Sequence, residues 1–469
     1  MRNTKIVATL GPASSSPEMI GKLIAAGVDI FRLNASHGTA EDRAQWTRTI
    51  REQSASADHI VGILLDLQGP KIRLGKFENG GCVLETGARF AITTQECLGT
   101  PARVSTTYAE FAKDVKAGDR VLLADGSIEL RVARTDGVVA ECDVVSGGPI
   151  SDRKGINLPG VQVSTPSLTK KDMADLRSGL EAGVDMVAMS FVRRGQDLLR
   201  LRHFLEEHDA DIPMIAKIEK PEAWANVDEI IDACAGVMVA RGDLGVEMAL
   251  EKVPFIQKSI IERARAKGHF AITATQMLES MIENPYPTRA EVSDVANAIF
   301  DGTDCVMLSA ETSVGKYPVE TVKMMRRIAR EAEATIPPWR KSDLAPAAAT
   351  HPEIVADAAY RASRIMNAAA IVVFTSSGYS ARLVSRYRPP VPIYAFTPSL
   401  VVARQLSAIY GIRAVEAPVL GSTDEMMDQM DKTLVERGLV KLGDRVVFVA
   451  GHPIGRSGTT NLMRLHVVD

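Results

Sequence analysis

The sequence predicts an α/β protein, a (β/α)8 TIM barrel with an inserted small β-barrel domain and a C-terminal α/β domain. Eight short apolar runs alternate with stretches whose apolar residues recur at helical spacing, which is the pattern of repeated βα units. A long segment rich in turn pairs interrupts this alternation, and a break rich in proline and alanine comes after it. The 469 residues are enough for about three domains of ordinary size.

The predicted barrel strands are continuous apolar runs, as expected for parallel strands that are covered on both faces. They occupy Lys5–Leu10, Asp29–Leu33, Ile60–Leu67, Asp185–Phe191, Pro213–Ile218, Gly236–Ala240, His269–Ala274 and Asp304–Leu308. The clearest predicted helices lie at Asp172–Leu180, Leu198–Glu206, Lys252–Lys267 and Val319–Glu333. We therefore assign residues 1–70 and 166–335 to the barrel.

Residues 71–165 form the predicted insertion, a lid that follows the third barrel strand. This segment lacks strong helix signals and contains the turn pairs Asn79-Gly80, Asp125-Gly126, Asp136-Gly137 and Gly147-Gly148. The break between Ile336 and Thr350 is a predicted linker. Residues 345–469 form the predicted C-terminal domain, with strands at Ala370–Thr375, Ile393–Phe396, Ile412–Val415, Arg445–Ala450 and near Leu465–Val468.

Composition argues against several kinds of partner. Lys and Arg total 55 against 58 Asp and Glu, and a net charge of −3 gives no strong field to recruit nucleic acid or anionic membrane. No apolar stretch reaches the roughly 18 residues that suggest a membrane span, and the N-terminal apolar run is too short for a secretory signal. The five cysteines include no CxxC pair, which disfavours a disulfide framework or a zinc site. We expect a cytoplasmic protein.

The active site of such a barrel lies at the C-terminal ends of its strands. Glu219 and Asp243 are carboxylates that follow neighbouring predicted strands, and such oxygen ligands suit Mg2+. Arg32, Arg73 and Lys217 place cations at the same mouth. The sequence therefore predicts a site for anionic, phosphorylated, metal-bound substrates. Other polar residues that follow the strands are Thr9, Asn34, Ser36, His37, Asp66, Lys71, Ser190, Arg193, Arg241, Thr273, Thr275, Gln276, Ser309, Glu311 and Thr312.

Each of these residues also has a structural explanation. A single charged residue at a strand end is as often a solvated loop residue. Asp243 and Glu219 could be helix caps, and Thr273 and Thr275 could be ordinary strand formers. The coincidence of several polar strand ends with one chemical theme favours the phosphate and metal site. These strand ends contain no Cys–His or Ser–His–Asp set, which disfavours acyl-transfer hydrolysis.

Several strand-end segments resemble long motifs of the pyruvate kinases. Arg32–Gly38 resembles their RxNxSHG motif, Ile215–Glu219 their (S/A)KIE motif and Met238–Gly245 their VARGDLG motif. Ala274–Met281 matches ATQMLESM, and Met307–Thr312 resembles MLSxET. The motifs stand in family order, and the insertion and the terminal domain fit the family as well. The resemblance therefore covers essentially the whole chain.

The resemblance implies that the enzyme transfers the phosphoryl group of phosphoenolpyruvate to ADP, giving ATP and pyruvate, the last step of glycolysis. Glu219 and Asp243 would hold a protein-bound Mg2+, and a second Mg2+ would arrive with ADP. Lys217 and Arg32 would stabilise the transferring phosphoryl group.

The same resemblance assigns roles to further residues. The backbone of Gly242 and Asp243 would meet the substrate carboxylate. Thr275 and Ser309 would serve the protonation of the enolate. The nucleotide side would contain Asn34, His37, Arg73 and Lys171. Family members are usually homotetramers, and we expect a homotetramer here.

One departure from the family concerns the monovalent cation. Many members bind K+ with oxygens that match Asn34, Ser36 and Asp66, and they commonly carry Glu where this chain has Lys71. A lysine ammonium has the charge of K+ at the end of a flexible stem. We therefore expect Lys71 to replace K+ and activity to be independent of K+, as in a known subgroup of the family. The alternative is that Lys71 points to solvent and K+ still binds.

Two further segments leave questions open. Many relatives carry Lys where Val314 stands, and Lys316 lies two residues on. In the C-terminal domain a hydroxyl-rich loop runs from a strand into a helix, and pyruvate kinases use the matching loop to bind the phosphate of an allosteric effector. Simple N-capping by Ser376 or Ser377 explains this loop equally well. The candidate effector-phosphate residues are Thr375, Ser376, Ser377, Gly378 and Ser380.

Two other functions stay open at this point. A different Mg2+-dependent barrel enzyme, such as a lyase or aldolase acting on a 2-keto acid, would need neither the lid nor the residues of the nucleotide side. A catalytically silent paralogue would be signalled by loss of a key site residue. Lys217, Glu219, Asp243 and Thr275 are all present.

Overall fold

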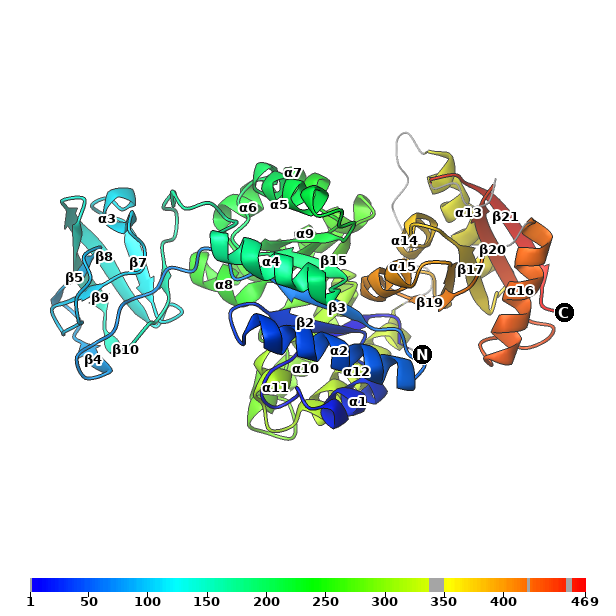
Figure 1. Ribbon diagram of the computed structural model, residues 1–469, viewed down its shortest axis with the longest axis horizontal. Helices are drawn as coiled ribbons and strands as arrows, with labels where there is room; N and C mark the ends of the chain where they lie inside the picture. Colours follow the sequence, from blue (N-terminus) through cyan, green and yellow to red (C-terminus); the bar gives the residue numbers. More distant parts are fainter. Residues whose placement is uncertain (1, 337–349, 420–421, 453–457) are drawn as a thin grey trace.

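Three domains lie in a row in the computed structural model, which describes residues 2–336, 350–419, 422–452 and 458–469 (Figure 1). The β/α barrel is in the middle, the inserted lid is at one end and the C-terminal α/β domain is at the other. Most of the predicted linker, residues 337–349, lies outside the described residues.

The barrel is closed and wholly parallel, with the strand order β1-β16-β15-β14-β13-β12-β3-β2. The predicted (β/α)8 barrel is confirmed, because each predicted apolar run overlaps one of its strands. Nearly every strand residue is buried, as their continuous apolar character requires. The strands are β1 (Lys5–Thr9), β2 (Ile30–Asn34), β3 (Gly62–Asp66), β12 (Met186–Met189), β13 (Met214–Ile218), β14 (Gly236–Ala240), β15 (Phe270–Ala274) and β16 (Cys305–Leu308).

Helices cover the outside of the barrel. Thr169 shows why one of them begins where it does, since Thr169 and Asp172 form a capping box at the start of α4, and Gly183 ends that helix in the left-handed conformation. The helices are α1 (Pro17–Ala26), α2 (Ala40–Ser56), α4 (Lys170–Ala182), α5 (Gly195–Glu207), α6 (Pro221–Ala225), α7 (Val227–Ala233), α8 (Arg241–Glu247), α9 (Val253–Ala266), α10 (Arg289–Asp301), α11 (Ala310–Ser313) and α12 (Pro318–Thr335). Two short 3-10 turns, η1 (Leu250–Lys252) and η2 (Glu279–Ile282), complete the set.

The inserted lid is a β domain with its own hydrophobic core, built around buried residues such as Phe90, Phe111 and Leu130. Its strands form a six-stranded sheet, β11-β7-β8-β9-β5-β6, and a separate two-stranded sheet, β10-β4, rather than one closed ring. The elements are β4 (Gly81–Leu84), β5 (Arg89–Thr93), β6 (Arg103–Ser105), α3 (Phe111–Asp114), β7 (Arg120–Leu123), β8 (Ile128–Thr135), β9 (Val139–Ser146), β10 (Gly148–Ser151) and β11 (Ile156–Asn157).

The C-terminal domain is a five-stranded sheet in the order β19-β18-β17-β20-β21. Four strands are parallel, and only β21 pairs antiparallel, with β20. The predicted last strand is longer than expected, because β21 begins at Thr460. The elements are α13 (His351–Ile365), β17 (Ala370–Phe374), α14 (Tyr379–Ser385), β18 (Ile393–Thr397), α15 (Leu400–Gln405), η3 (Leu406–Ala408), β19 (Ile412–Glu416), α16 (Thr423–Glu436), β20 (Arg445–Gly451) and β21 (Thr460–Val467).

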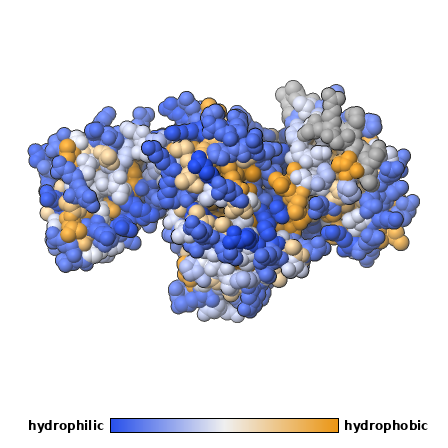
Figure 2. Space-filling model, viewed as in Figure 1, coloured by the Kyte–Doolittle hydropathy of each residue, from blue (hydrophilic) through white to orange (hydrophobic). Residues whose placement is uncertain are grey.

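The C-terminal domain closes the bottom of the barrel. One hydrophobic cluster runs from the barrel interior, including Val7 and Met238, to Leu406 and Ile409 of the C-terminal domain. Figure 2 shows hydrophobic residues along the side of the C-terminal domain that faces the barrel, and further hydrophobic patches on the barrel and on the lid. The barrel mouth is therefore the free end, and it faces the lid.

Polar contacts reinforce this junction. The guanidinium of Arg388 donates to Asp304 at 2.9 Å and to the carbonyl of Gly302 at 2.6 Å, and it stacks over the ring of Tyr410. The ammonium of Lys5 donates to the carbonyl of Ile412 at 2.5 Å. None of the helices in the described ranges is long and apolar enough to cross a membrane.

Replacing Arg388 by Ala should lower the free energy of unfolding by about 2 kcal/mol, because the buried Asp304 carboxylate loses a charged donor. Urea titration measures the change. Arg361→Ala is the matched control, since that arginine makes an exposed pair with Asp357 within one helix and should leave stability unchanged. Equal stability of the wild type and the Arg388 variant would contradict the role given to this contact.

Candidate active site

The centre of the barrel mouth is a buried group of two carboxylates and two cations. Lys217, at the end of β13, places its ammonium 2.8 Å from Glu219 and 3.3 Å from Asp66. Arg32, from β2, donates through Nε and Nη2 to the same oxygen of Asp66, both at 2.7 Å. The strand ends of β2, β3 and β13 therefore meet in one charge network, as the barrel topology predicts.

Burial and charge together set the protonation of this network. Burial opposes ionisation of Asp66, but the cations of Lys217 and Arg32 outweigh it and lower the pKa of Asp66 below its ordinary value. Burial also opposes the Lys217 ammonium, yet Asp66 and Glu219 raise its pKa above the ordinary value. Asp66 and Lys217 are thus both charged at neutral pH.

The pKa of Glu219 shifts in the opposite direction to that of Asp66. Burial raises its pKa, and although Lys217 lowers it, the negative charge of Asp243 adds to the rise. Its side chain is only 2% exposed. Two neighbouring carboxylates at one strand edge are suited to a divalent cation.

The loop after β12 supports Glu219 and Lys217. Ser190 accepts a hydrogen bond from the Lys217 ammonium at 2.7 Å and donates to the carbonyl of Leu67 at 2.8 Å. The backbone N–H of Phe191 donates to Glu219 at 3.1 Å. Phe191 reaches this position with φ +57°, a conformation that costs a residue of its type on the order of 1–3 kcal/mol.

Thr275 is also strained. It follows β15 with φ +67°, and Gln276 follows it with φ +54°. Gly242 donates its N–H to the Thr275 hydroxyl at 2.8 Å, and Arg241 donates to the Thr275 carbonyl at 2.6 Å. Arg241 is itself held by Asp294 at 2.7 Å. Thr275 is therefore not an ordinary strand former, whereas Thr273 is wholly buried and bonded to Thr303 within the barrel.

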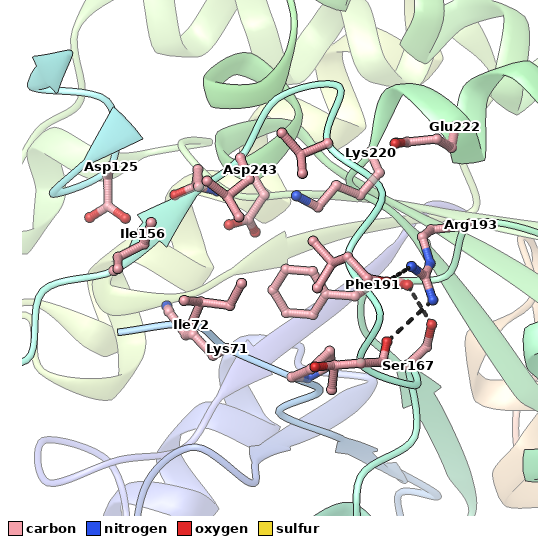
Figure 3. Close-up of a pocket in the computed structure, with 17 residues that line it drawn as sticks. Lys71, Ile72, Asp125, Ile156, Ser167, Phe191, Arg193, Lys220, Glu222 and Asp243 are labelled. Atoms are coloured by element: carbon pink, nitrogen blue, oxygen red, sulfur yellow. Dashed lines mark hydrogen bonds between the residues drawn. The ribbon is translucent and has the colours of Figure 1, made fainter. Parts of the chain in front are cut away.

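Asp243 lies in the first turn of α8 and lines a cavity between the lid and the barrel mouth (Figure 3). The cavity encloses about 700 Å³ of empty space, open solvent included. The capping explanations do not apply, because α8 is capped at Ala240 and α6 at Lys220, neither with a side-chain cap bond. Neither carboxylate therefore serves as a helix cap.

Ser309 directly follows β16 and is the last of the predicted catalytic residues along the chain. Its buried hydroxyl has no hydrogen-bond partner among the described residues. Its N–H donates at 2.7 Å to Glu311, a buried carboxyl that also accepts from the N–H of Leu278 at 3.2 Å. Burial raises the pKa of Glu311. A hydroxyl and a carboxyl whose pKa is raised by burial thus lie at one strand end.

Comparison with known proteins identifies the family to which the chain belongs. The family model described as "Pyruvate kinase, barrel domain" matches residues 1–322, and "Pyruvate kinase, alpha/beta domain" matches residues 353–466. The pyruvate kinase of Geobacillus stearothermophilus is 46% identical over all of this chain and 81% of its own length, and that of Corynebacterium glutamicum is 46% identical over all of this chain and 98% of its own length.

The chain belongs to the pyruvate kinase family. The crystal structure of a pyruvate kinase from Cryptosporidium parvum superposes with a TM-score of 0.93 at 35% identity, covering all of this chain and 96% of that one. The protein is thus a phosphotransferase of this family, whose substrates are phosphoenolpyruvate and ADP. These matches remove the lyase or aldolase alternative.

The residues on the predicted nucleotide side of the pyruvate kinase site lie around the loop after β2. Asn34 accepts a hydrogen bond from the N–H of Ser36 at 3.0 Å. Burial lowers the pKa of His37, and the cations of Arg32 and Lys71 add to this effect. Lys171 is docked against the loop, donating to the carbonyl of Ala35 at 2.9 Å and to Asp175 at 2.6 Å.

Arg73 and Lys71 belong to the connection into the lid. Arg73 lies in the hinge, the connection that leads from β3 into the lid, and donates to the carbonyl of Arg153 in the lid at 3.0 Å. Lys71 is exposed and lines the cavity of Figure 3. Asp66 pairs with Arg32 and Lys217, and no ion pair joins it to Lys71 within the described part of the chain. In this arrangement the cations beside Asp66 are Arg32 and Lys217.

The predicted effector loop of the C-terminal domain lies before α14. Gly378, with φ +78°, occupies the N-cap position of α14. Ser380 is buried and shares a hydrogen bond with Thr460 of β21 at 2.5 Å, and Thr375 is buried at the end of β17.

Lys316, two residues after Val314, forms an ion pair with Glu283 on the barrel surface.

Three contacts of the site escaped the sequence analysis. They are the hydrogen bond from Phe191 to Glu219, the hydrogen bond from Arg241 to Thr275, and the ion pair between Lys220 and Glu247. Of the three donors, only Arg241 lies in a motif that the sequence analysis had singled out, Met238–Gly245.

A separate cluster of Asp431, His466 and Asp469 lies in the C-terminal domain, away from the barrel mouth, and His466 and Asp431 pair with each other there.

Asp66→Asn should destabilise the protein by about 3 kcal/mol at neutral pH, because Lys217 and Arg32 lose a buried counter-charge. A carboxyl with a lowered pKa stabilises the fold above its unfolded pKa of about 3.9, and this contribution is lost as the pH falls through the lower folded value. Urea titration from pH 8 to pH 3 should therefore show a constant difference from the wild type that narrows only below about pH 4. Asp424→Asn, at an exposed site, is the control. A difference that already narrows at pH 6 would rule out this assignment.

Proposed function

We propose that the protein is a Mg2+-dependent pyruvate kinase in which Glu219 and Asp243 hold the metal and Lys217 and Arg32 act on the transferring phosphoryl group. The reaction moves the phosphoryl group of phosphoenolpyruvate to ADP, giving ATP and pyruvate. The observation that carries the proposal is the Lys217 ammonium, held between Asp66 and Glu219 at the barrel mouth. It is charged, oriented and close to both metal carboxylates.

The residues present fit a divalent cation. Glu219 and Asp243 offer oxygen donors from adjacent strand ends, and besides burial the negative charge of Asp243 raises the pKa of Glu219, as expected for two carboxylates that lie close together. When bound, the metal would neutralise charge on the substrate oxygens and help to orient them. A second Mg2+ would enter with ADP rather than on protein ligands.

Different groups of the protein would bind the phosphoryl group, the substrate carboxylate and the nucleotide. Lys217 and Arg32 are positioned before the substrate arrives, so they stabilise charge on the phosphoryl oxygens with little reorganisation. The N–H of Gly242 donates to the Thr275 hydroxyl, whereas the N–H of Asp243, also in the first turn of α8, has no acceptor within the helix and suits the substrate carboxylate. We place the nucleotide against Asn34, His37, Arg73 and Lys171.

After transfer, the enolate must gain a proton at its methylene carbon to become pyruvate. Thr275 is held rigidly beside Gly242 by two donors, so its hydroxyl can serve this step at a fixed position. Ser309 and Glu311 extend the proton path behind it, because burial keeps a proton on Glu311 to a higher pH than usual. Closing of the lid over the cavity would keep water from the phosphoryl group.

Glu219→Gln should reduce kcat/KM at least 100-fold at a fixed Mg2+ concentration, since one of the two metal carboxylates is lost. The assay couples pyruvate formation from phosphoenolpyruvate, ADP and Mg2+ to lactate dehydrogenase. Glu222→Gln, a neighbouring glutamate on the cavity wall, is the control and should stay within about threefold of the wild type. Inactivity of the wild type under these conditions would point to a silent paralogue and defeat the proposal.

Independence from K+ is the second part of the proposal. Lys71 lies where many relatives carry Glu, is exposed on the hinge into the lid, and is close enough to His37 to lower its pKa. Closure of the lid could carry the Lys71 ammonium toward Asn34, Ser36 and Asp66. This part of the proposal rests on the charge of the residue and on its place at the hinge.

Activity measured in tetramethylammonium buffer should not change when KCl is added. Lys71→Glu should lose activity at least tenfold in that buffer and recover with KCl, because the variant restores the residue of K+-dependent relatives. Lys76→Glu, farther along the same connection, is the charge-matched control. A wild type that needs K+ would refute the role given to Lys71 without touching the reaction.

Three further expectations keep the status of predictions. The C-terminal domain would bind a phosphorylated effector through Thr375, Ser376, Ser377, Gly378 and Ser380, and the protein would be a cytoplasmic homotetramer. Titration of enzyme activity with sugar phosphates and nucleoside monophosphates, together with light scattering, addresses the first and the last of these.

A further inference from the structure

Glu247 is a buried carboxylate that the mechanism above does not use. It ends α8, the helix whose first turn carries Asp243, and the two residues lie on one helix face because they are four positions apart. Its side chain is 1% exposed. A buried charge of this kind needs a partner, and its partners show what it does.

One oxygen of Glu247 takes both polar contacts. The ammonium of Lys220 lies 2.5 Å from Oε1, and the side-chain amide of Asn157 donates to the same oxygen at 3.0 Å. Oε2 is buried and has no partner among the described residues. Asn157 belongs to β11 of the lid, so Glu247 joins the lid, α8 and the end of β13 at one point.

Lys220 stands beside the metal carboxylates. It directly follows Glu219 and lines the same cavity as Asp243, and Figure 3 shows its ammonium pointing toward Asp243. Its ammonium also lies 5.7 Å from the centre of the Phe191 ring, whose backbone supports Glu219. A lysine stem is flexible, so an ammonium released from Glu247 would reach these carboxylates.

We propose that Glu247 is a positioning residue that holds and neutralises Lys220, and so keeps this ammonium from competing with the divalent cation for Glu219 and Asp243. The inference rests on the proposed function, in which those two carboxylates hold the metal. An unpaired Lys220 ammonium beside Glu219 and Asp243 would form ion pairs with these carboxylates and weaken their attraction for a cation. The Lys220–Glu247 pair has no net charge, so Glu219 and Asp243 keep their negative charge for the metal.

Direct metal binding tests this role without relying on turnover. Mn2+ binding to the substrate-free enzyme is measured by electron paramagnetic resonance for the wild type and for Glu247→Gln, which keeps an acceptor for Asn157 but loses the negative charge. We expect about tenfold weaker Mn2+ binding in the variant, corresponding to about 1.4 kcal/mol. The Mg2+ concentration for half-maximal activity should rise similarly, with kcat at saturating Mg2+ near that of the wild type.

The double variant Glu247→Gln with Lys220→Met provides the decisive comparison, because it removes the released ammonium. Mn2+ binding should return to within about threefold of the wild type. Two controls accompany it: Glu251→Gln removes an exposed carboxylate one turn on, and Asn157→Ala breaks the lid contact but keeps the charge pair. Both should leave Mn2+ binding within twofold of the wild type, and thermal unfolding verifies that every variant folds.

The outcomes separate the two proposals. Normal Mn2+ binding by Glu247→Gln overturns the role of Glu247, as does a loss that Lys220→Met fails to restore or that Asn157→Ala reproduces. Absent binding by the wild type, or unchanged binding by Glu219→Gln, overturns the metal site itself and the inference with it. Weak binding by the single variant with recovery in the double variant supports both.

Discussion

The barrel mouth depends on the buried carboxylate of Asp66. Two cations, Lys217 and Arg32, must stand ready for a highly charged substrate, and each would repel the other in a site shielded from water. Asp66 lies between them, hydrogen-bonded to Arg32 and in an ion pair with Lys217. The ends of β2, β3 and β13 are thereby fixed relative to one another, so the site is organised before any ligand is present.

Backbone strain also occurs at the barrel mouth. Phe191 and Thr275 both adopt positive φ angles, one behind Glu219 and the other beside Gly242. Each is held by a partner that an isolated loop would lack, namely the carboxylate of Glu219 and the guanidinium of Arg241. The strained conformations of these loops lower the free energy of unfolding. In return they fix the directions of the Phe191 N–H and the Thr275 hydroxyl.

Sequence patterns were informative where topology leaves little choice. Continuous apolar runs predicted every barrel strand, and the rule that strand ends converge predicted that Arg32, Lys217 and Glu219 would meet. Spacing carried no information on how side chains pair across the mouth. It could not show that Asp66 is already paired with Lys217, that α8 starts before Asp243, or that Glu247 receives Lys220, because these depend on three-dimensional packing and the placement of the lid.

The hydrophobic cluster at the bottom of the barrel has a consequence for unfolding. Because barrel interior and C-terminal domain share one core, neither can lose its packing without exposing apolar surface of the other. The lid has a core of its own. The chain should thus contain three domains but only two cooperative units, and the lid can open or unfold locally while the barrel and its C-terminal partner stay intact.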